Sequence, residues 1–198
     1  MGLTLGDMTD RQLLQAYAGG HNLHAFEAFV SRHEGPLLAF AAAVLRDDSG
    51  AQDVVQEVFL RVARAPQRLL SGTVSGERNW LLKVARDLSV DCLRRRALER
   101  KAVHVLAAAP ERLAPAPDAA MQVQEETARM QAAIEGLKPR LRELLILKVR
   151  EQKSYKEIAQ ITGLSVTNVG FLLHQALEEL RNFSPQRRRD AENSRKNG

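Results

Sequence analysis

The stretch Ser154–Leu180, SYKEIAQITGLSVTNVGFLLHQALEEL, decides the fold of the second half of the chain. It begins with a capping box, because Ser154 can accept a hydrogen bond from the Glu157 amide while the Glu157 side chain reaches back. A short apolar-periodic segment ends at Gly163, which permits a left-handed turn, and Ser165 can cap the next segment. This spacing predicts a helix-turn-helix, which would place the start of its second helix in the DNA major groove. A plain helical hairpin in a bundle is the alternative at this point.

The regular helical pattern breaks once, in a stretch rich in alanine and proline. Residues 102–120 contain three prolines and no sustained apolar period, which disfavours a long helix. We therefore expect an all-α protein with two small helical domains, at residues 9–101 and 121–183, joined by a flexible linker at 102–120. The polar residues 184–198 are expected to form a disordered basic tail.

Apolar periodicity also predicts the helices of the two domains. In the first domain, residues 47–49 offer caps for a helix that ends before Pro66, and its buried stripe is expected at Ala51, Val54, Val55, Val58, Phe59 and Val62. Gly35-Pro36 is expected to interrupt the preceding helix, and residues 67–76 to form a loop. The next helix is expected to bury Trp80, Leu81, Val84, Ala85 and Leu88. In the second domain, Pro139 suits a first turn, and the inward residues are predicted to be Leu141, Leu144, Leu145 and Val149.

Composition and charge narrow the class of protein. The 198 residues include 29 Lys and Arg against 24 Asp and Glu, and the net charge of +5 favours a polyanionic partner. The single cysteine, Cys92, permits no internal disulfide and indicates a reducing compartment. The first ten residues lack the basic and apolar segments of a signal peptide, so we expect none, and the sequence contains no apolar run of the roughly 20 residues that a membrane helix needs. We expect a cytoplasmic protein without membrane contact, cofactor or metal site, and the sequence offers no catalytic triad or phosphate loop of an enzyme.

A second signal is the basic segment from Arg78 to Lys101, which contains eight Lys and Arg residues. Trp80 and this basic series could serve a nucleic acid, with its phosphates held by the cationic side chains. The alternative is that Trp80 belongs to the core and that the charges form a solvated face.

These motifs resemble the extracytoplasmic-function sigma factors of bacterial RNA polymerase. DVVQEVFLRV (Asp53–Val62) and WLLKVARDLSVDCLRRR (Trp80–Arg96) are similar to their region 2, and Leu137–Arg181 is similar to their region 4. The resemblance implies that region 2 docks on the clamp of the polymerase β′ subunit, and melts and captures the minus-ten element. It implies that region 4 binds the β flap and reads the minus-thirty-five element, while the polymerase performs the chemistry.

The resemblance also implies which residues carry these functions. Asp53 and Glu57, spaced by four residues, would contact the polymerase. The residues expected to serve promoter melting are Ser71, Thr73, Ser75, Arg78, Trp80, Lys83 and Arg86. The residues expected to face the upstream element are Thr167, Asn168, Phe171 and Gln175. Asn and Gln can pair bidentately with adenine, and Phe can touch a thymine methyl group.

The chain departs from the family pattern in both regions. Gly50-Ala51-Gln52-Asp53 stands where Asp-Ala-Glu-Asp is usual, so two carboxylates expected to meet the clamp are missing. A phosphate on Ser49, at the predicted N-cap, could restore that charge and would make Ser49 a regulatory phosphosite. The plainer expectation is that Ser49 is only a cap. In the recognition helix, the family often has Lys and Arg where this chain has Gly170, Leu172, Gln175 and Leu177, so we expect fewer electrostatic contacts with DNA.

Two other functions are consistent with these motifs. The helix-turn-helix could belong to a repressor or activator whose first domain is a sensor. Alternatively, the chain could be a polymerase-binding regulator that never touches promoter DNA. For a sigma factor, the expected partners are core RNA polymerase and promoter DNA, and an anti-sigma factor or a protein kinase would provide control.

Overall fold

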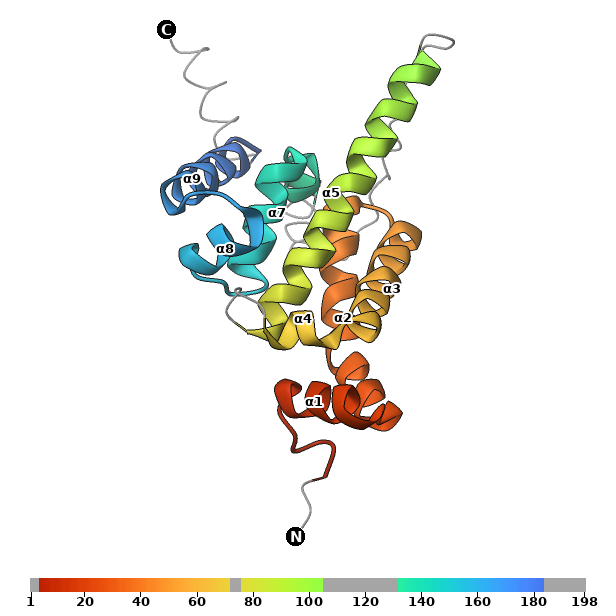
Figure 1. Cartoon of the computed structure of the whole chain (residues 1–198). Coiled ribbons are helices and arrows are strands. Elements are labelled where there is room, and N and C mark those ends of the chain that lie inside the picture. Colours follow the sequence, from red (N-terminus) through yellow and green to blue (C-terminus); the bar gives the residue numbers. More distant parts are fainter. Residues whose placement is uncertain (1–3, 72–75, 105–131, 184–198) are drawn as a thin grey trace, which may run out of the picture.

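The protein is described by a computed structural model that covers residues 4–71, 76–104 and 132–183 (Figure 1). These residues contain helices and no strand, which confirms the all-α prediction. None of the described helices combines the length and apolar composition needed to cross a membrane. The labelled helices are α1 (Asp10–Gly20), α2 (Leu23–Leu45), α3 (Asp48–Arg64), α4 (Pro66–Leu70), α5 (Glu77–His104), α7 (Pro139–Val149), α8 (Tyr155–Thr162) and α9 (Val166–Phe183).

Side-chain caps fix several helix starts. Thr9 and Gln12 form a capping box at the start of α1, and Ser154 and Glu157 form the predicted one at α8. The cap of α3 is Asp47, whose carboxylate accepts a hydrogen bond from the Ser49 amide at 3.1 Å. The prediction of Ser49 as the N-cap is therefore wrong, because Asp47 already holds the extended cap conformation and Ser49 lies inside the first turn.

Helix α2 runs without interruption through Gly35-Pro36, contrary to the sequence prediction. A proline inside a helix removes one backbone hydrogen bond and costs stability. The packing of α2 offsets this cost, because the helix contacts α1, α3, α5 and α7 and buries apolar side chains before and after the proline. Phe29 and Phe40 are both completely buried. Tertiary packing therefore overrides the local breaker signal.

The segment predicted as a loop contains a short helix. Pro66 occupies the first position of α4, where its missing amide hydrogen costs nothing, and Leu69 is buried. Residues 72–75 lie outside the described part of the chain. Helix α5 continues to His104, past residue 102 where the linker is predicted to begin, and the rest of that predicted linker lies outside the described residues.

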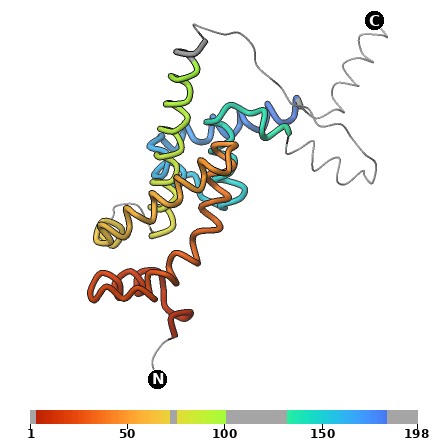
Figure 2. The backbone as a smooth tube through the Cα atoms, turned by 90° about the vertical axis from the view of Figure 1, so that its right-hand side faces the viewer, coloured from red at the N-terminus to blue at the C-terminus, as the bar shows by residue number. Residues whose placement is uncertain are grey.

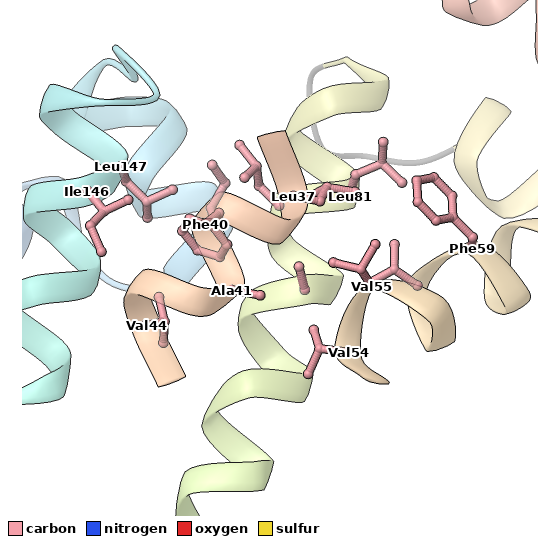
Figure 3. Packing of buried hydrophobic residues seen from close by; sticks show 14 of the residues in the cluster. Leu37, Phe40, Ala41, Val44, Val54, Val55, Phe59, Leu81, Ile146 and Leu147 are labelled. Carbon is pink, nitrogen blue, oxygen red and sulfur yellow. The ribbon is translucent and has the colours of Figure 1, made fainter. Parts of the chain in front are cut away.

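One apolar core joins the first and second halves of the chain. Helix α7 packs on α2 and α8 packs on α5, while α9 packs on α7 and α8 (Figures 1 and 2), and α1 lies at one end of the molecule. Ile146 and Leu147 of α7 face Phe40 of α2, and Leu81 of α5 belongs to the same cluster (Figure 3). Val149, which was predicted to point inward, is 66% exposed, because α7 turns the Ile146–Leu147 side toward α2 instead. We call this packing of the two halves the closed arrangement.

Candidate nucleic-acid and polymerase interface

Helices α8 and α9 form the predicted helix-turn-helix. Gly163 adopts the left-handed conformation with φ of 72°, which glycine reaches without steric cost, and so separates the two helices. The Ser165 hydroxyl accepts a hydrogen bond from the Asn168 amide at 3.2 Å and caps α9. Completely buried Val169 and Ala176 dock α9 on the rest of the unit. These contacts hold the start of α9 at the surface.

The exposed side of α9 carries few charges. Thr167, Asn168 and Phe171 are exposed, and 67% of the Phe171 surface is accessible. Gln175 is half-buried, and its amide nitrogen lies 3.3 Å from a carboxylate oxygen of Glu179. The sequence of α9 contains no lysine and only one arginine, near its end. Contacts made by this face can therefore be amide hydrogen bonds and apolar contacts, with little attraction to phosphates.

The predicted polymerase-contacting residues share one side of α3. Asp53 is exposed, and Glu57 lies one turn further along and accepts a hydrogen bond from Arg61 at 2.9 Å. Leu60 lies on the same side and is 42% exposed. Carboxylates beside an exposed leucine suit contact with a basic protein surface that also has apolar groups.

Gly50 makes room for an ion pair between α3 and α5. Arg96 of α5 donates a hydrogen bond to the carboxylate of Asp47, and this bond lowers the pKa of Asp47 below its usual range. A Cβ atom at Gly50 would lie 2.7 Å from the Arg96 guanidinium and 2.7 Å from the Asp47 carboxylate. A side chain at position 50 would therefore displace the pair, which gives a physical reason for glycine at the start of α3.

The residues predicted to serve promoter melting lie along the first turns of α5. Arg78 is bound by Glu151 at 2.7 Å, and Arg86 is bound by Glu143 at 2.7 Å. Both carboxylates come from the second half of the chain. Lys83 instead lies 3.6 Å from Asp87 within α5.

Four other residues were predicted to serve promoter melting: Trp80, Ser71, Thr73 and Ser75. Trp80 is half-buried and packs against the core, as the plainer alternative expects. Ser71 is exposed, and its hydroxyl donates to the carbonyl of Gln67 at 2.6 Å. Thr73 and Ser75 lie outside the described residues.

Three acidic residues that the sequence did not mark as functional face α5. They are Glu143, Glu151 and Glu157, and the third accepts a hydrogen bond from the Asn79 amide at 3.0 Å. The paired residues are separated by 57 to 78 positions in the chain. No local spacing signal connects residues that far apart, although the capping box identified Glu157 as a structural residue.

Burial and pairing act on these carboxyl groups in opposite directions. Burial raises the pKa of Glu143, whose side chain is 3% exposed, and the positive charge of Arg86 opposes this rise. Hydrogen bonds from Asn79 and from Ser154 lower the pKa of Glu157 to about 2. Over the described residues, no group of three or more His, Cys, Asp or Glu side chains is placed to hold a metal ion.

Models of two protein-family regions match two separate parts of the chain. The family model "Sigma-70 region 2" matches residues 29–99, and "Sigma-70, region 4" matches residues 127–180. The chain is 31% identical over 153 residues to the ferric citrate uptake sigma factor FecI of Escherichia coli, which covers 77% of this chain and 87% of that protein. It is 28% identical over 162 residues to the ECF RNA polymerase sigma factor SigE of Mycolicibacterium smegmatis, which covers 80% of this chain and 61% of that protein.

A solved structure has the same fold. The sigma factor RpoE of Bartonella quintana, solved in complex with the anti-sigma factor NepR, superimposes with a TM-score of 0.62 at 20% identity. The match covers 80% of this chain and 95% of that one. At this identity the likeness concerns the fold alone.

Proposed function

Because the chain belongs to the sigma-70 family through both region 2 and region 4, we propose that it works as an alternative sigma factor of the extracytoplasmic-function type. It binds core RNA polymerase, recognises promoter DNA and helps to melt it so that transcription starts. The observation that carries this proposal is the presence of both regions, in this order, in one chain. A helix-turn-helix alone would fit many transcription regulators.

Region 2 supplies the polymerase contact and the melting surface. The exposed side of α3, with Asp53 and Glu57, docks on the β′ clamp through charge complementarity. The first turns of α5 meet the DNA, where Arg78, Lys83 and Arg86 hold phosphates of the opened strand. Trp80 and the serine and threonine residues before α5 (Ser71, Thr73 and Ser75) complete the site for the minus-ten element.

Region 4 reads the upstream element through the start of α9 and binds the β flap. The reading residues are Thr167, Asn168, Phe171 and Gln175. The exposed amide of Asn168 can pair with an adenine edge, and the exposed ring of Phe171 can cover a thymine methyl group. The shortage of positive charge on α9 means that most of the phosphate attraction must come from elsewhere in the polymerase complex.

The protein acts in the cytoplasm with the polymerase and has no catalytic centre of its own, because the polymerase joins the nucleotides. An anti-sigma factor controls it by covering the surfaces that meet the polymerase. Ser49 offers a second route of control, since its side chain is exposed in the first turn of α3, beside the polymerase-contacting face. A phosphate there would add about 1.5 to 2 negative charges near a helix N-terminus, which favours anions.

Run-off transcription tests the proposal and separates it from its rivals. The purified chain is added to bacterial core RNA polymerase on a library of genomic fragments, and transcript 5′ ends are sequenced. A sigma factor gives transcripts that start at a shared motif and that are absent without the chain. Duplex binding without polymerase and without new transcripts would indicate a repressor or activator. Binding to polymerase without new start sites would indicate a polymerase-binding regulator, which the weakly charged α9 also suits.

A further inference from the structure

We propose that the groove between α7, α9 and the junction of α2 with α3 binds a long-chain fatty acid. Its carboxylate would lie on arginines of the groove, and its alkyl chain along the apolar walls. The groove has a volume of about 900 Å³, which is within the range of sites that hold small molecules. Among the described residues that line it, none is proposed to meet DNA or the polymerase clamp, so this inference goes beyond the proposed function.

Three helices supply the apolar walls of this groove. Ala42 and Ala43 line it from α2, Leu145 and Val149 from α7, and Leu180 from near the end of α9. Alanine side chains are short, so α2 leaves space opposite the longer side chains of α7 and α9. Val149 is 66% exposed, and an alkyl chain lying over it would remove apolar surface from water. The walls therefore suit the tail of an amphiphile.

Arg142 of α7 is a buried cation on the wall of the groove. The residue is 4% exposed, and its guanidinium donates to the backbone carbonyls of Glu135 at 2.8 Å and Val44 at 3.2 Å. Its Nε–H has no hydrogen-bond partner, and within the described part of the chain Arg142 forms no ion pair with a carboxylate. Buried charges in proteins are ordinarily paired. An anionic ligand would supply the missing counter-charge.

Two more arginines add positive charge along the same groove. Arg46, at the end of α2, is 54% exposed, and Arg150 donates to the carbonyl of Ala39 at 3.3 Å. Burial lowers the pKa of Arg142, the charge of Arg46 lowers it further, and the charge of Glu135 opposes both effects. The guanidinium groups of Arg46 and Arg142 therefore repel each other across the lining, and a carboxylate beside them would relieve this repulsion.

The acidic residues of the lining leave this positive charge largely unused. Asp47 already accepts a hydrogen bond from Arg96, and Asp48 is exposed in the first turn of α3. The carboxylate of Glu135 lies 3.5 Å from Arg46, which is longer than a charge-assisted hydrogen bond. The planar donors of a guanidinium match a carboxylate. A ligand carboxylate can therefore take the place of Glu135 beside Arg46, whereas a cationic ligand would meet three arginines.

The test titrates the full-length protein with sodium decanoate, below the concentration at which decanoate forms micelles and at a pH where its carboxylate is ionised. Isothermal titration calorimetry measures stoichiometry and Kd. We expect one saturable site, and an affinity that rises about fourfold for each added methylene from hexanoate through octanoate to decanoate. 1-Decanol has the same chain without the charge and should bind about tenfold more weakly than decanoate.

A substitution in the apolar wall has a matched control elsewhere on the surface. Val149→Glu brings a negative charge to the wall and should weaken decanoate binding about tenfold. Leu23→Glu is the control, because Leu23 is 64% exposed at the start of α2 and does not line the groove. The control should bind decanoate as tightly as wild type.

The head-group contact is tested in the same way. Arg46→Gln removes one guanidinium and should weaken decanoate binding about two- to fivefold, because Arg46 is half exposed to solvent. Arg94→Gln is the control, since Arg94 is an exposed arginine of α5 that pairs with Asp91. Circular dichroism verifies that all four variants are folded.

A second readout needs no substitution in the groove. The Nε–H resonance of Arg142 in a proton–nitrogen NMR spectrum reports the surroundings of the buried guanidinium directly. Decanoate should shift this resonance in the wild-type protein, and 1-decanol should shift it much less.

Three outcomes overturn the proposed site. They are the absence of saturable decanoate binding, equal affinity for decanoate and 1-decanol, and equal binding by each groove variant and its control. The first of these would leave the groove to a protein partner. The run-off transcription assay keeps this failure apart from failure of the proposed function: if the protein directs transcription but does not bind decanoate, the sigma function stands and only the fatty-acid site is excluded.

Discussion

Glu143 of α7 lies 2.7 Å from Arg86 of α5, although 57 positions separate the two residues in the chain. This pair links region 4 to the surface of region 2 that is proposed to open the promoter. It also shows that the two halves, which the sequence presents as separate helical segments, share one interface in the closed arrangement. The expected consequences concern helix packing, DNA reading, pH dependence and control.

The Arg96–Asp47 pair should determine the effect of a side chain at Gly50. An alanine inside a helix is ordinarily more stable than glycine by about 0.5–1 kcal/mol. Here the added Cβ would meet both members of the pair at 2.7 Å, so Gly50→Ala should lose most of that gain. In an Arg96→Ala background part of the gain should return, because only the Asp47 carboxylate still lies 2.7 Å from the added Cβ. Urea unfolding of the four proteins measures this coupling, and additive effects of the two substitutions would contradict it.

Phe171 should contribute to promoter reading and little to stability. Its ring is 67% exposed, so Phe171→Ala should change the free energy of unfolding by less than about 0.5 kcal/mol. Loss of an apolar base contact should weaken holoenzyme binding to the preferred upstream element, by less than the roughly 1–3 kcal/mol that a bidentate hydrogen-bonded pair with a base contributes. Leu177→Ala is the matched control, because Leu177 is 50% exposed on the same helix but lines a pocket together with Ala42 of α2 and Ile146 of α7. Equal losses in the two variants would argue against reading by Phe171.

Glu157 should make the protein less stable in acid. Its pKa falls from the ordinary value of 4.5 to about 2 in the folded protein, because the ionised form accepts hydrogen bonds from Asn79 and Ser154. A carboxyl group with a lowered pKa stabilises the fold above its unfolded value and loses this contribution as the pH falls toward the folded value. Glu157→Gln should therefore show a shallower loss of stability between about pH 4.5 and 2. Parallel stability curves for the two proteins over this range would be the contrary result.

Phosphorylation of Ser49 should strengthen binding to the polymerase clamp. Gly50 and Gln52 leave the start of α3 two carboxylates short of the family pattern, and a phosphate would supply a similar charge. Core-polymerase affinity is measured for the unmodified protein, Ser49→Glu and Ser49→Ala, and then for enzymatically phosphorylated protein. The phosphorylated form should bind most tightly. Tight and equal binding by the unmodified protein and Ser49→Ala would leave Ser49 as a helix residue without a regulatory role.

Local chemistry made much of the fold predictable. The helix-turn-helix followed from the Ser154 capping box and Gly163, and the buried side of α3 followed from apolar residues at steps of three and four. Predictions were wrong where tertiary packing decided the outcome. Pro36 lies inside a continuous helix because the α2 core compensates for it, and Val149 points outward because α7 packs on α2 through its neighbours.

Of the candidate site, only the residues on α5 could be predicted from the sequence. The basic and aromatic residues of α5 form a local pattern, so Arg78 and Arg86 could be selected from the sequence. Their partners could not, because Glu143 and Glu151 look like ordinary helix-surface charges until region 4 folds back on α5. The ion pair between Arg96 and Asp47, which accounts for a glycine at position 50, could not be predicted for the same reason, since Arg96 is far from Asp47 in the chain.

Promoter opening is the central claim, and permanganate reactivity of unpaired promoter thymines tests it most directly. The wild-type chain with core polymerase should make thymines of the minus-ten element reactive. Arg78→Glu should lose most of this reactivity while still binding core polymerase in a pull-down, because Arg78 is proposed to meet DNA and not the clamp. Arg94→Glu is the control, since Arg94 is exposed further along α5 and, among the residues that the structure describes, forms an ion pair with nearby Asp91. Unreactive thymines in a wild-type complex that holds both polymerase and promoter, or equal loss of polymerase binding and reactivity in Arg78→Glu, would contradict the account.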